Sequence, residues 1–182
     1  VDSTRTLRAF GPYWNEDGSL AVLDVRAADN KDRWLARLNP EDGSVTSLDR
    51  QHDDAWIAGP GISWYGGAST LGWMPDGETI YVQSEETGYS HLYTINVESG
   101  EKTALTEGNF EVFDPQLTQD GSAWLFASTE DSPHNRQWYR MPAEGGERTR
   151  ITSGQDGQYA AAPHPNDTTL GLLYEYITQP PE

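Results

Sequence analysis

The sequence predicts an all-β fold made of four-stranded antiparallel meanders, and three observations lead to it. A turn dipeptide recurs as Asp17-Gly18, Asp76-Gly77 and Asp120-Gly121. Short runs rich in Val, Ile, Thr, Tyr and Trp follow each of these turns, and further Gly-containing turns separate them, which is the pattern of strands joined by hairpins. No stretch of useful length shows the period of a helix. Four strands per unit at a period of about 45 residues are typical of β-propeller blades.

The units follow one another with the same order of runs. The first reads WNEDG, SLAVLDVRA, ADNKDR, WLARLNPE, DGS and VTSLDR, and the second reads WMPDG, ETIYVQSEE, TGYS, HLYTINVE, SGEK and TALTEG. The third reads LTQDG, SAWLFASTE, DSPHNR, QWYRMPAE, GGER and TRITSG. We therefore place blades at about residues 11–50, 68–108 and 109–154 and an incomplete blade at 155–182, with an insertion loop at about 52–67. The expected fold is a partial propeller of about three and a half blades, cut from a longer protein.

Charge and composition exclude several classes of function. The 182 residues include 29 Asp and Glu against 12 Lys and Arg, which gives a formal net charge of −17. Nucleic-acid binding needs clustered cations, so DNA and RNA are not expected partners. The chain has no cysteine, which excludes disulfides, thiolate metal sites and thiol catalysis. No run reaches the roughly 18 apolar residues that a membrane span requires, so none is expected.

Two stretches of the chain resemble a known family. SEETGYSHLYTINVESGEKTALTEGNFEVFDP, followed by STEDSPHNRQWYRMPAEGGERTRITSG, is similar to the propeller domain of dipeptidyl peptidase IV and its bacterial relatives in the prolyl oligopeptidase family of serine peptidases. DRQHDDAWI and the closing TQPPE also resemble that family, so the likeness covers residues 45–182 well and the first 45 loosely. It implies a non-catalytic propeller that gates access to a peptidase active site and walls its binding cavity.

The resemblance also implies that these residues contain no catalytic triad, and it implies the partners of the chain. In that family the catalytic Ser, Asp and His belong to an α/β-hydrolase domain that follows the propeller, and none of them is expected in these residues. The nearest approach to a nucleophile elbow, around Ser63, is one residue out of register and lies in a loop. The implied partners are the hydrolase domain in cis and, through the parent enzyme, a peptide substrate. The resemblance favours a periplasmic or secreted location, which the residues themselves leave open.

The insertion loop contains the candidate site residues. Trp64 and Tyr65 lie in its glycine-rich part, and the resembling family has a loop in about this place that directs an aromatic side chain toward the substrate cavity. We therefore expect Trp64 or Tyr65 to line that cavity, with burial against the blade edge as the alternative. Glu85-Glu86 differs from the family's glutamate pair, and we expect it to be a solvated hairpin turn.

The remaining polar residues are expected to be structural. His52, His91, His134 and His164 have no metal-ligand spacing, so neither a metal nor a cofactor is predicted. His91 is expected to fix its hairpin by a hydrogen bond. Asp53-Asp54 gives no acid–base pair, because neighbouring residues point in opposite directions. Packing between blades is expected of the strand aromatics Tyr81, Tyr93, Trp124, Trp138, Tyr139 and Tyr174.

Two other interpretations stay open. The chain could be a stand-alone propeller module that binds a protein or a sugar, and a stop codon after TQPPE would favour that interpretation. It could also be a complete four-bladed propeller, if residues 1–10 supplied an outer strand to the last blade. In any partial propeller the exposed sheet faces and strand edges predict self-association of the isolated chain.

Overall fold

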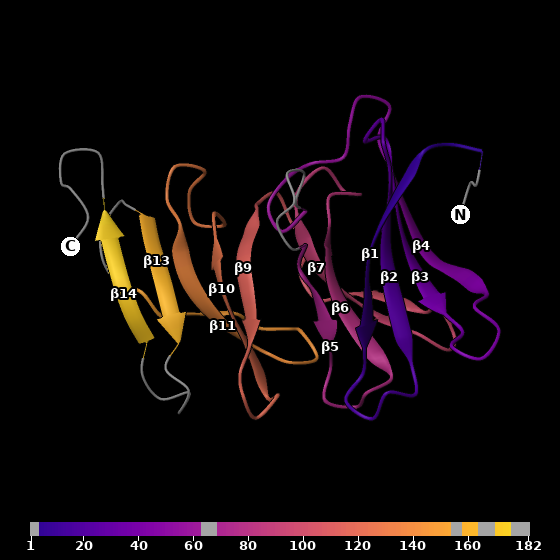
Figure 1. Ribbon diagram of the computed structural model, residues 1–182. Coiled ribbons are helices and arrows are strands. Elements are labelled where there is room, and N and C mark those ends of the chain that lie inside the picture. Colours follow the sequence, from indigo (N-terminus) through magenta and orange to yellow (C-terminus); the bar gives the residue numbers. More distant parts are fainter. Residues whose placement is uncertain (1–3, 63–68, 154–157, 164–169, 176–182) are drawn as a thin grey trace. The chain divides into compact units, whose positions relative to one another are not determined.

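The structure of the protein is a computed structural model that describes residues 4–62, 69–153, 158–163 and 170–175 (Figure 1). In this described part every regular element is a β-strand. None of the described residues forms a helix of the length and apolarity needed to cross a membrane.

The strands form three four-stranded antiparallel sheets and one hairpin. The first sheet has the order β1-β2-β3-β4, with β1 at Leu7–Trp14, β2 at Ala21–Ala27, β3 at Asp32–Leu38 and β4 at Val45–His52. The second has the order β5-β6-β7-β8, with β5 at Leu71–Trp73, β6 at Thr79–Ser84, β7 at His91–Asn96 and β8 at Lys102–Ala104. The third consists of β9 at Val112–Leu117, β10 at Ala123–Ser128, β11 at Gln137–Pro142 and β12 at Thr149–Arg150. The hairpin pairs β13, Gln158–Pro163, with β14, Leu170–Glu175.

The prediction of an all-β protein built from propeller blades is confirmed. Each four-stranded sheet places its strands in chain order, as a propeller blade does. The N-terminal run does not complete the last blade, because Leu7–Phe10 pairs with β2 in the first sheet. A closed four-bladed propeller would need these residues to pair with the last blade instead, so the structure does not support that interpretation.

The Asp-Gly dipeptides at 17–18, 76–77 and 120–121 form the same turn between the first and second strands of each four-stranded sheet. Their glycines have φ values of 75°, 69° and 70°, a region that side chains with a Cβ rarely adopt. Each glycine amide donates to the carbonyl three residues earlier: Gly18 to Asn15 (3.1 Å), Gly77 to Met74 (3.0 Å) and Gly121 to Thr118 (2.8 Å). Each aspartate accepts from a backbone amide two residues later: Asp17 from Ser19, Asp76 from Glu78 and Asp120 from Ser122. The repeat seen in the sequence therefore corresponds to a repeated turn in the structure, with the same glycine conformation and the same two hydrogen bonds.

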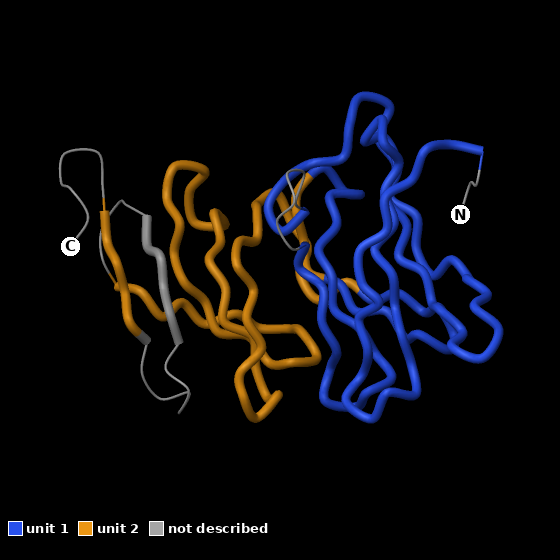
Figure 2. Tube along the Cα trace, viewed as in Figure 1, with its two compact units in different colours: residues 1–88, 93–103 blue, residues 89–92, 104–182 orange. Residues whose placement is uncertain are grey.

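The chain divides into two compact units, shown in different colours in Figure 2. Unit 1 contains residues 1–88 and 93–103, and unit 2 contains residues 89–92 and 104–182. In unit 1, Val22 and Leu35 of the first sheet share a buried cluster with Ile80, Val82, Tyr93, Ile95 and Val97. In unit 2, Trp138 of β11 packs with Leu125, Ala127 and Phe113. Tyr93 thus packs between sheets as expected.

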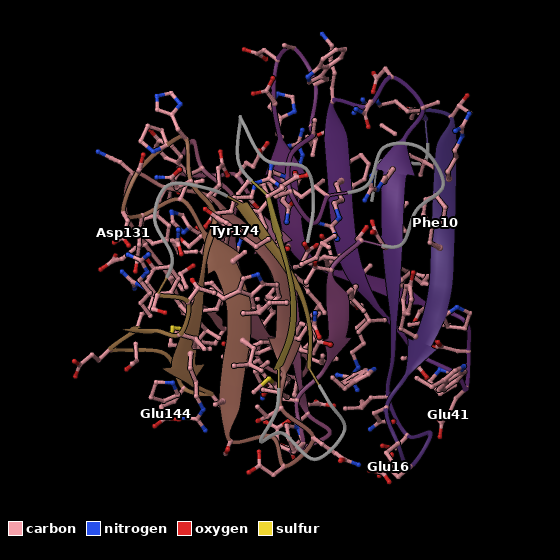
Figure 3. All side chains as sticks on the ribbon, turned by 90° about the vertical axis from the view of Figure 1, so that its left-hand side faces the viewer. Phe10, Glu16, Glu41, Asp131, Glu144 and Tyr174 are labelled. Atoms are coloured by element: carbon pink, nitrogen blue, oxygen red, sulfur yellow. The ribbon has the colours of Figure 1, made fainter. Side chains whose placement is uncertain are left out.

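Large apolar side chains are exposed on two edge strands. Phe10 and Trp14 on β1 are 38% and 45% exposed, and Figure 3 shows Phe10 beside that strand. Leu172 and Leu173 on β14 are 43% and 48% exposed. Edge strands with exposed apolar side chains favour association, so these residues support the self-association of the isolated chain, which stays a prediction.

Candidate functional site

The predicted site residues Trp64 and Tyr65 lie outside the described residues, as does Ser63. The structure does describe the two ends of the insertion that contains them, residues 53–62 and 69–70. The candidate site is therefore built from the base of this insertion and from the side chains of unit 1 that hold it.

The first half of the insertion is fixed to the β2–β3 hairpin. Ile57 donates its amide to the Asn30 carbonyl at 2.8 Å, and the Asn30 side-chain amide donates back to the Ile57 carbonyl at 2.8 Å. Asn30 has a φ of 59°, a left-handed conformation that Asn tolerates better than most residues. Ile57 and Ile62 are 7% and 2% exposed. Two hydrogen bonds and two buried side chains therefore anchor this half.

The two ends of the insertion meet at a neck between Gly61 and Thr70. The Thr70 amide donates to the Gly61 carbonyl at 2.8 Å, and the Thr70 hydroxyl donates to Gln83 Oε1 at 2.7 Å. A Cβ on Gly61 would lie 1.8 Å from Gln83 Oε1, and one on Gly59 would lie 1.7 Å from Glu85 Oε1. Both contacts are far inside van der Waals distance. Those oxygens end flexible side chains, but Gly59 and Gly61 also have φ values of 111° and 69°, which residues with a Cβ rarely adopt, so the backbone here favours glycine.

A buried charge network lies under this neck. Asp24 is 1% exposed and accepts from Arg33 Nε at 3.1 Å and Nη2 at 3.2 Å. Ser69 donates its hydroxyl to Asp24 Oδ2 at 2.7 Å and accepts from Arg26 Nη2 at 2.5 Å. Arg33, 1% exposed, also donates to the Gln83 carbonyl at 3.1 Å. The network therefore ties the far end of the insertion to β2, β3 and β6.

The charges of the two arginines determine the ionisation of Asp24. Burial opposes its charged form, but the charges of Arg33 and Arg26 outweigh burial and hold the pKa of Asp24 below its usual range. Asp24 is shared by the two arginines, so the three charges sum to +1. The Gln83 carbonyl and the Ser69 hydroxyl accept further hydrogen bonds from Arg33 and Arg26, so both buried guanidinium groups have polar partners.

The described residues of the insertion offer no arrangement for covalent catalysis. Ser69 bonds to a carboxylate and a guanidinium and not to an imidazole base, so its hydroxyl is not activated as a nucleophile. Asp53 caps a turn by accepting from the Ala55 and Trp56 amides at 2.7 and 2.9 Å. Among the described residues no group of three or more His, Cys, Asp or Glu side chains is placed to hold a metal ion.

Glu86 lies in the predicted hairpin turn and also takes part in an ion pair. Its Oε2 accepts from Lys102 Nζ at 2.6 Å, and Lys102 Nζ also lies 3.1 Å from Asp49. The lysine ammonium lies 4.7 Å from the centre of the Tyr93 ring. Glu86 is thus exposed in a hairpin turn, as predicted, and Lys102 in addition connects it to Asp49 of β4.

His91 forms the kind of bond that was predicted for it, with partners in the segment that follows β8. The side chain is fully buried, its Nδ1 lies 3.1 Å from Thr106 Oγ1, and its Nε2 lies 2.9 Å from the Gly108 carbonyl. A carbonyl can only accept, so Nε2 of His91 is the donor in this hydrogen bond. The Phe110 ring packs edge-on at 5.0 Å.

Asp32, at the start of β3, contacts two arginines and a histidine. Its carboxylate contacts Arg5, accepts from Arg50 Nε at 2.8 Å and lies 3.0 Å from His52 Nδ1. Burial works against its charge, but these hydrogen bonds lower the pKa of Asp32 to about 2. Hydrogen bonds to Asp32 and Asp54 in turn raise the pKa of His52.

Replacing Asp32 by Asn is expected to lower the free energy of unfolding by about 2 kcal/mol at pH 7. The folded-state pKa of Asp32 is depressed, so its contribution is present above the unfolded value near 3.9 and is lost as the pH falls toward 2. Urea unfolding at a series of pH values measures this, with the exposed Glu41→Gln change as the control. A difference between Asp32→Asn and the unchanged chain that persists undiminished at pH 2 would contradict it.

Comparisons with known proteins agree with this architecture. Residues 14–181 match the family model described as the dipeptidyl peptidase IV (DPP IV) N-terminal region. The chain belongs to the DPP IV N-terminal region family. The resemblance seen in the sequence is thereby confirmed, and the chain is a DPP IV-like N-terminal propeller segment.

Two relatives place this DPP IV N-terminal segment within longer proteins. The crystal structure of Porphyromonas gingivalis dipeptidyl peptidase 4 superposes with a TM-score of 0.72 at 18% identity, over 90% of this chain and 22% of that one. The uncharacterized protein Atu1656 of Agrobacterium fabrum is 26% identical over 105 residues, which are 57% of this chain and 35% of the relative. At these identities the structural likeness is one of fold. The chain spans about a third of the curated relative and about a fifth of the solved structure.

Proposed function

We propose that the chain is the non-catalytic propeller segment of a DPP IV-like serine exopeptidase, where it gates substrate access and forms part of the wall of the peptide-binding cavity. The observation that carries the proposal is the family match over residues 14–181. The hydrolase domain acts in cis, and the peptide meets this segment only within the longer polypeptide.

The base of the insertion supports a role as a wall. A wall that selects substrates has to hold its shape against the peptide, and rigid supporting residues provide this. The neck hydrogen bond between Gly61 and Thr70 and the buried Asp24 network beneath it meet that requirement. The net charge of −17 further favours approach of a peptide's N-terminal ammonium, through long-range attraction.

The proposal predicts that the 182-residue chain hydrolyses no Xaa-Pro chromogenic substrate, whereas the longer polypeptide that continues it does so. A serine-directed inhibitor should abolish the activity of the longer polypeptide. The assay is release of p-nitroaniline from Gly-Pro-p-nitroanilide. An inactive longer polypeptide, or inhibitor-sensitive cleavage by the 182-residue chain alone, would overturn the proposal.

In the longer enzyme, the changes Trp64→Ala and Tyr65→Ala test the predicted cavity lining. Loss of an aromatic wall contact is expected to raise KM about three- to tenfold for at least one of the two variants, with little change in kcat. Trp56→Ala is the matched control, since Trp56 lies in the same insertion and is 59% exposed. Equal KM values for all three variants and the parent enzyme would count against both residues.

A further inference from the structure

A second feature of unit 1 lies at the turns of its two sheets, away from the insertion. It is a hollow of about 350 Å³ between β4 and the turn that joins β7 to β8, and we call it the polar hollow. Its polar lining includes Arg37, Asn39, Thr46, Ser47, Glu98 and Ser99. Leu48 and the buried Val97 add an aliphatic part. Small-molecule sites occupy roughly 300–1,000 Å³, so the polar hollow matches the lower end of that range.

The charge of the polar hollow is unusual for this protein. Its lining has one cation and one anion, and they neutralise each other, since Arg37 Nη2 lies 2.7 Å from Glu98 Oε1. A neighbouring hollow of about 830 Å³ shares this pair but adds Glu16, Asp17, Asp76 and Glu78. Figure 3 shows Glu16 at the same end of unit 1 as Glu41. The polar hollow thus has zero formal charge and lies beside an acidic hollow. The acidic side chains repel an anionic ligand and attract a cationic ligand to the acidic hollow.

The polar groups of the hollow suit a ligand with many hydroxyls. Guanidinium and carboxylate groups are planar and can each make two parallel hydrogen bonds, which matches a pair of adjacent hydroxyls. The ion pair engages one nitrogen of Arg37, and the side chain remains 34% exposed. Hydroxyls such as Thr46 and Ser47 both donate and accept. The half-buried Leu48 provides apolar surface for the C–H groups of a ring.

We propose that the polar hollow binds a neutral saccharide of one or two rings, held by the Arg37–Glu98 pair and by the hydroxyl of Thr46. Zero net charge, a lining that both donates and accepts, and the small volume together select this class over anions, cationic peptides and apolar molecules. The proposal goes beyond the peptidase role and does not depend on it, so failure of either leaves the other standing.

The test uses the complete 182-residue chain, labelled with ¹⁵N, and a panel of maltose, cellobiose, lactose and sucrose. At least one disaccharide is expected to shift the amide resonances of Ser99 and Gly100, with a dissociation constant of about 1 mM. Thr46→Val keeps the shape of an exposed strand residue and should weaken binding about fivefold. Glu98→Gln removes a charged acceptor and should weaken it about tenfold.

Matched controls separate this hollow from its surroundings. Thr103→Val is the control for Thr46→Val, since Thr103 is exposed on β8. Glu78→Gln is the control for Glu98→Gln, since Glu78 lines the acidic hollow and not the polar hollow. Both control variants should bind the sugar as tightly as the unchanged chain does. The proposal is overturned if no sugar of the panel shifts Ser99 and Gly100, or if test and control variants respond equally. It is also overturned if only sulfate or an arginine-containing peptide shifts these two amides.

Discussion

The Asp24→Asn chain is expected to lose about 3–5 kcal/mol of its free energy of unfolding, the range found when one partner of a buried ion pair is removed. Asn keeps the shape of the side chain but leaves Arg33 and Arg26 with no compensating charge. Arg33 is 1% exposed, so water cannot take the place of the lost carboxylate. Urea unfolding followed by tryptophan fluorescence at pH 7 measures the effect.

Two further variants identify the cause. Glu41→Gln makes the same kind of change at an exposed position and should stay within about 0.5 kcal/mol of the unchanged chain. Ser69→Ala removes only the link to the insertion and should reduce stability by about 1 kcal/mol. If Asp24→Asn proves no more harmful than Glu41→Gln, the network does not support the neck.

The pH dependence of the same variant provides an independent check. The folded-state pKa of Asp24 lies below its usual value, so its stabilising contribution is complete above the unfolded pKa of about 3.9 and declines at lower pH. The stability gap between the Asp24→Asn variant and the unchanged chain should therefore narrow as the pH falls below about 4.

The network also shows what the sequence left hidden. The run AVLDVRA of β2 alternates in the way that suggests a strand with one solvated face, yet Asp24 and Arg26 on that face are 1% and 8% exposed. In the hairpin register Arg26 lies directly opposite Arg33, and two like charges in that position repel each other. Asp24 between them removes the repulsion. The sequence shows the three charged residues. It does not show the strand register that places the two arginines opposite each other, nor the contact of Arg33 with the β6 backbone.

Local features of the chain were far easier to predict. The Asp-Gly turns depend on a few neighbouring residues and on glycine's access to positive φ, so the sequence alone was enough to place them. The anchoring of the insertion depends on contacts over longer separations, such as Thr70 with Gln83 and Asn30 with Ile57. Gly59 and Gly61 themselves were the signal in the sequence, since glycines in a loop often mark positive φ values, as they do here.

The second large effect is expected at His91. Changing His91 to Ala should reduce the stability of the surrounding part of unit 2 by about 3 kcal/mol, because it opens a cavity and leaves buried hydrogen-bonding groups without partners. Thr106 Oγ1 also accepts from the Leu92 amide at 3.0 Å, so one hydroxyl connects the histidine to the strand pairing of β7. Hydrogen exchange at the Leu105 amide, which donates to the Leu92 carbonyl at 2.9 Å, measures the local loss.

Two comparisons separate the hydrogen bonds of His91 from its bulk. His91→Gln retains a donor and an acceptor and should be less damaging than His91→Ala, because part of the link to Thr106 and the Gly108 carbonyl can re-form. His134→Ala is the control, since His134 is exposed in the loop between β10 and β11, and it should change stability by less than about 0.5 kcal/mol. If exchange at Leu105 is equally fast in the His91→Ala and His134→Ala chains, His91 does not fix this segment. If His91→Gln is as damaging as His91→Ala, the shape of the ring holds the segment in place, and the two hydrogen bonds do not.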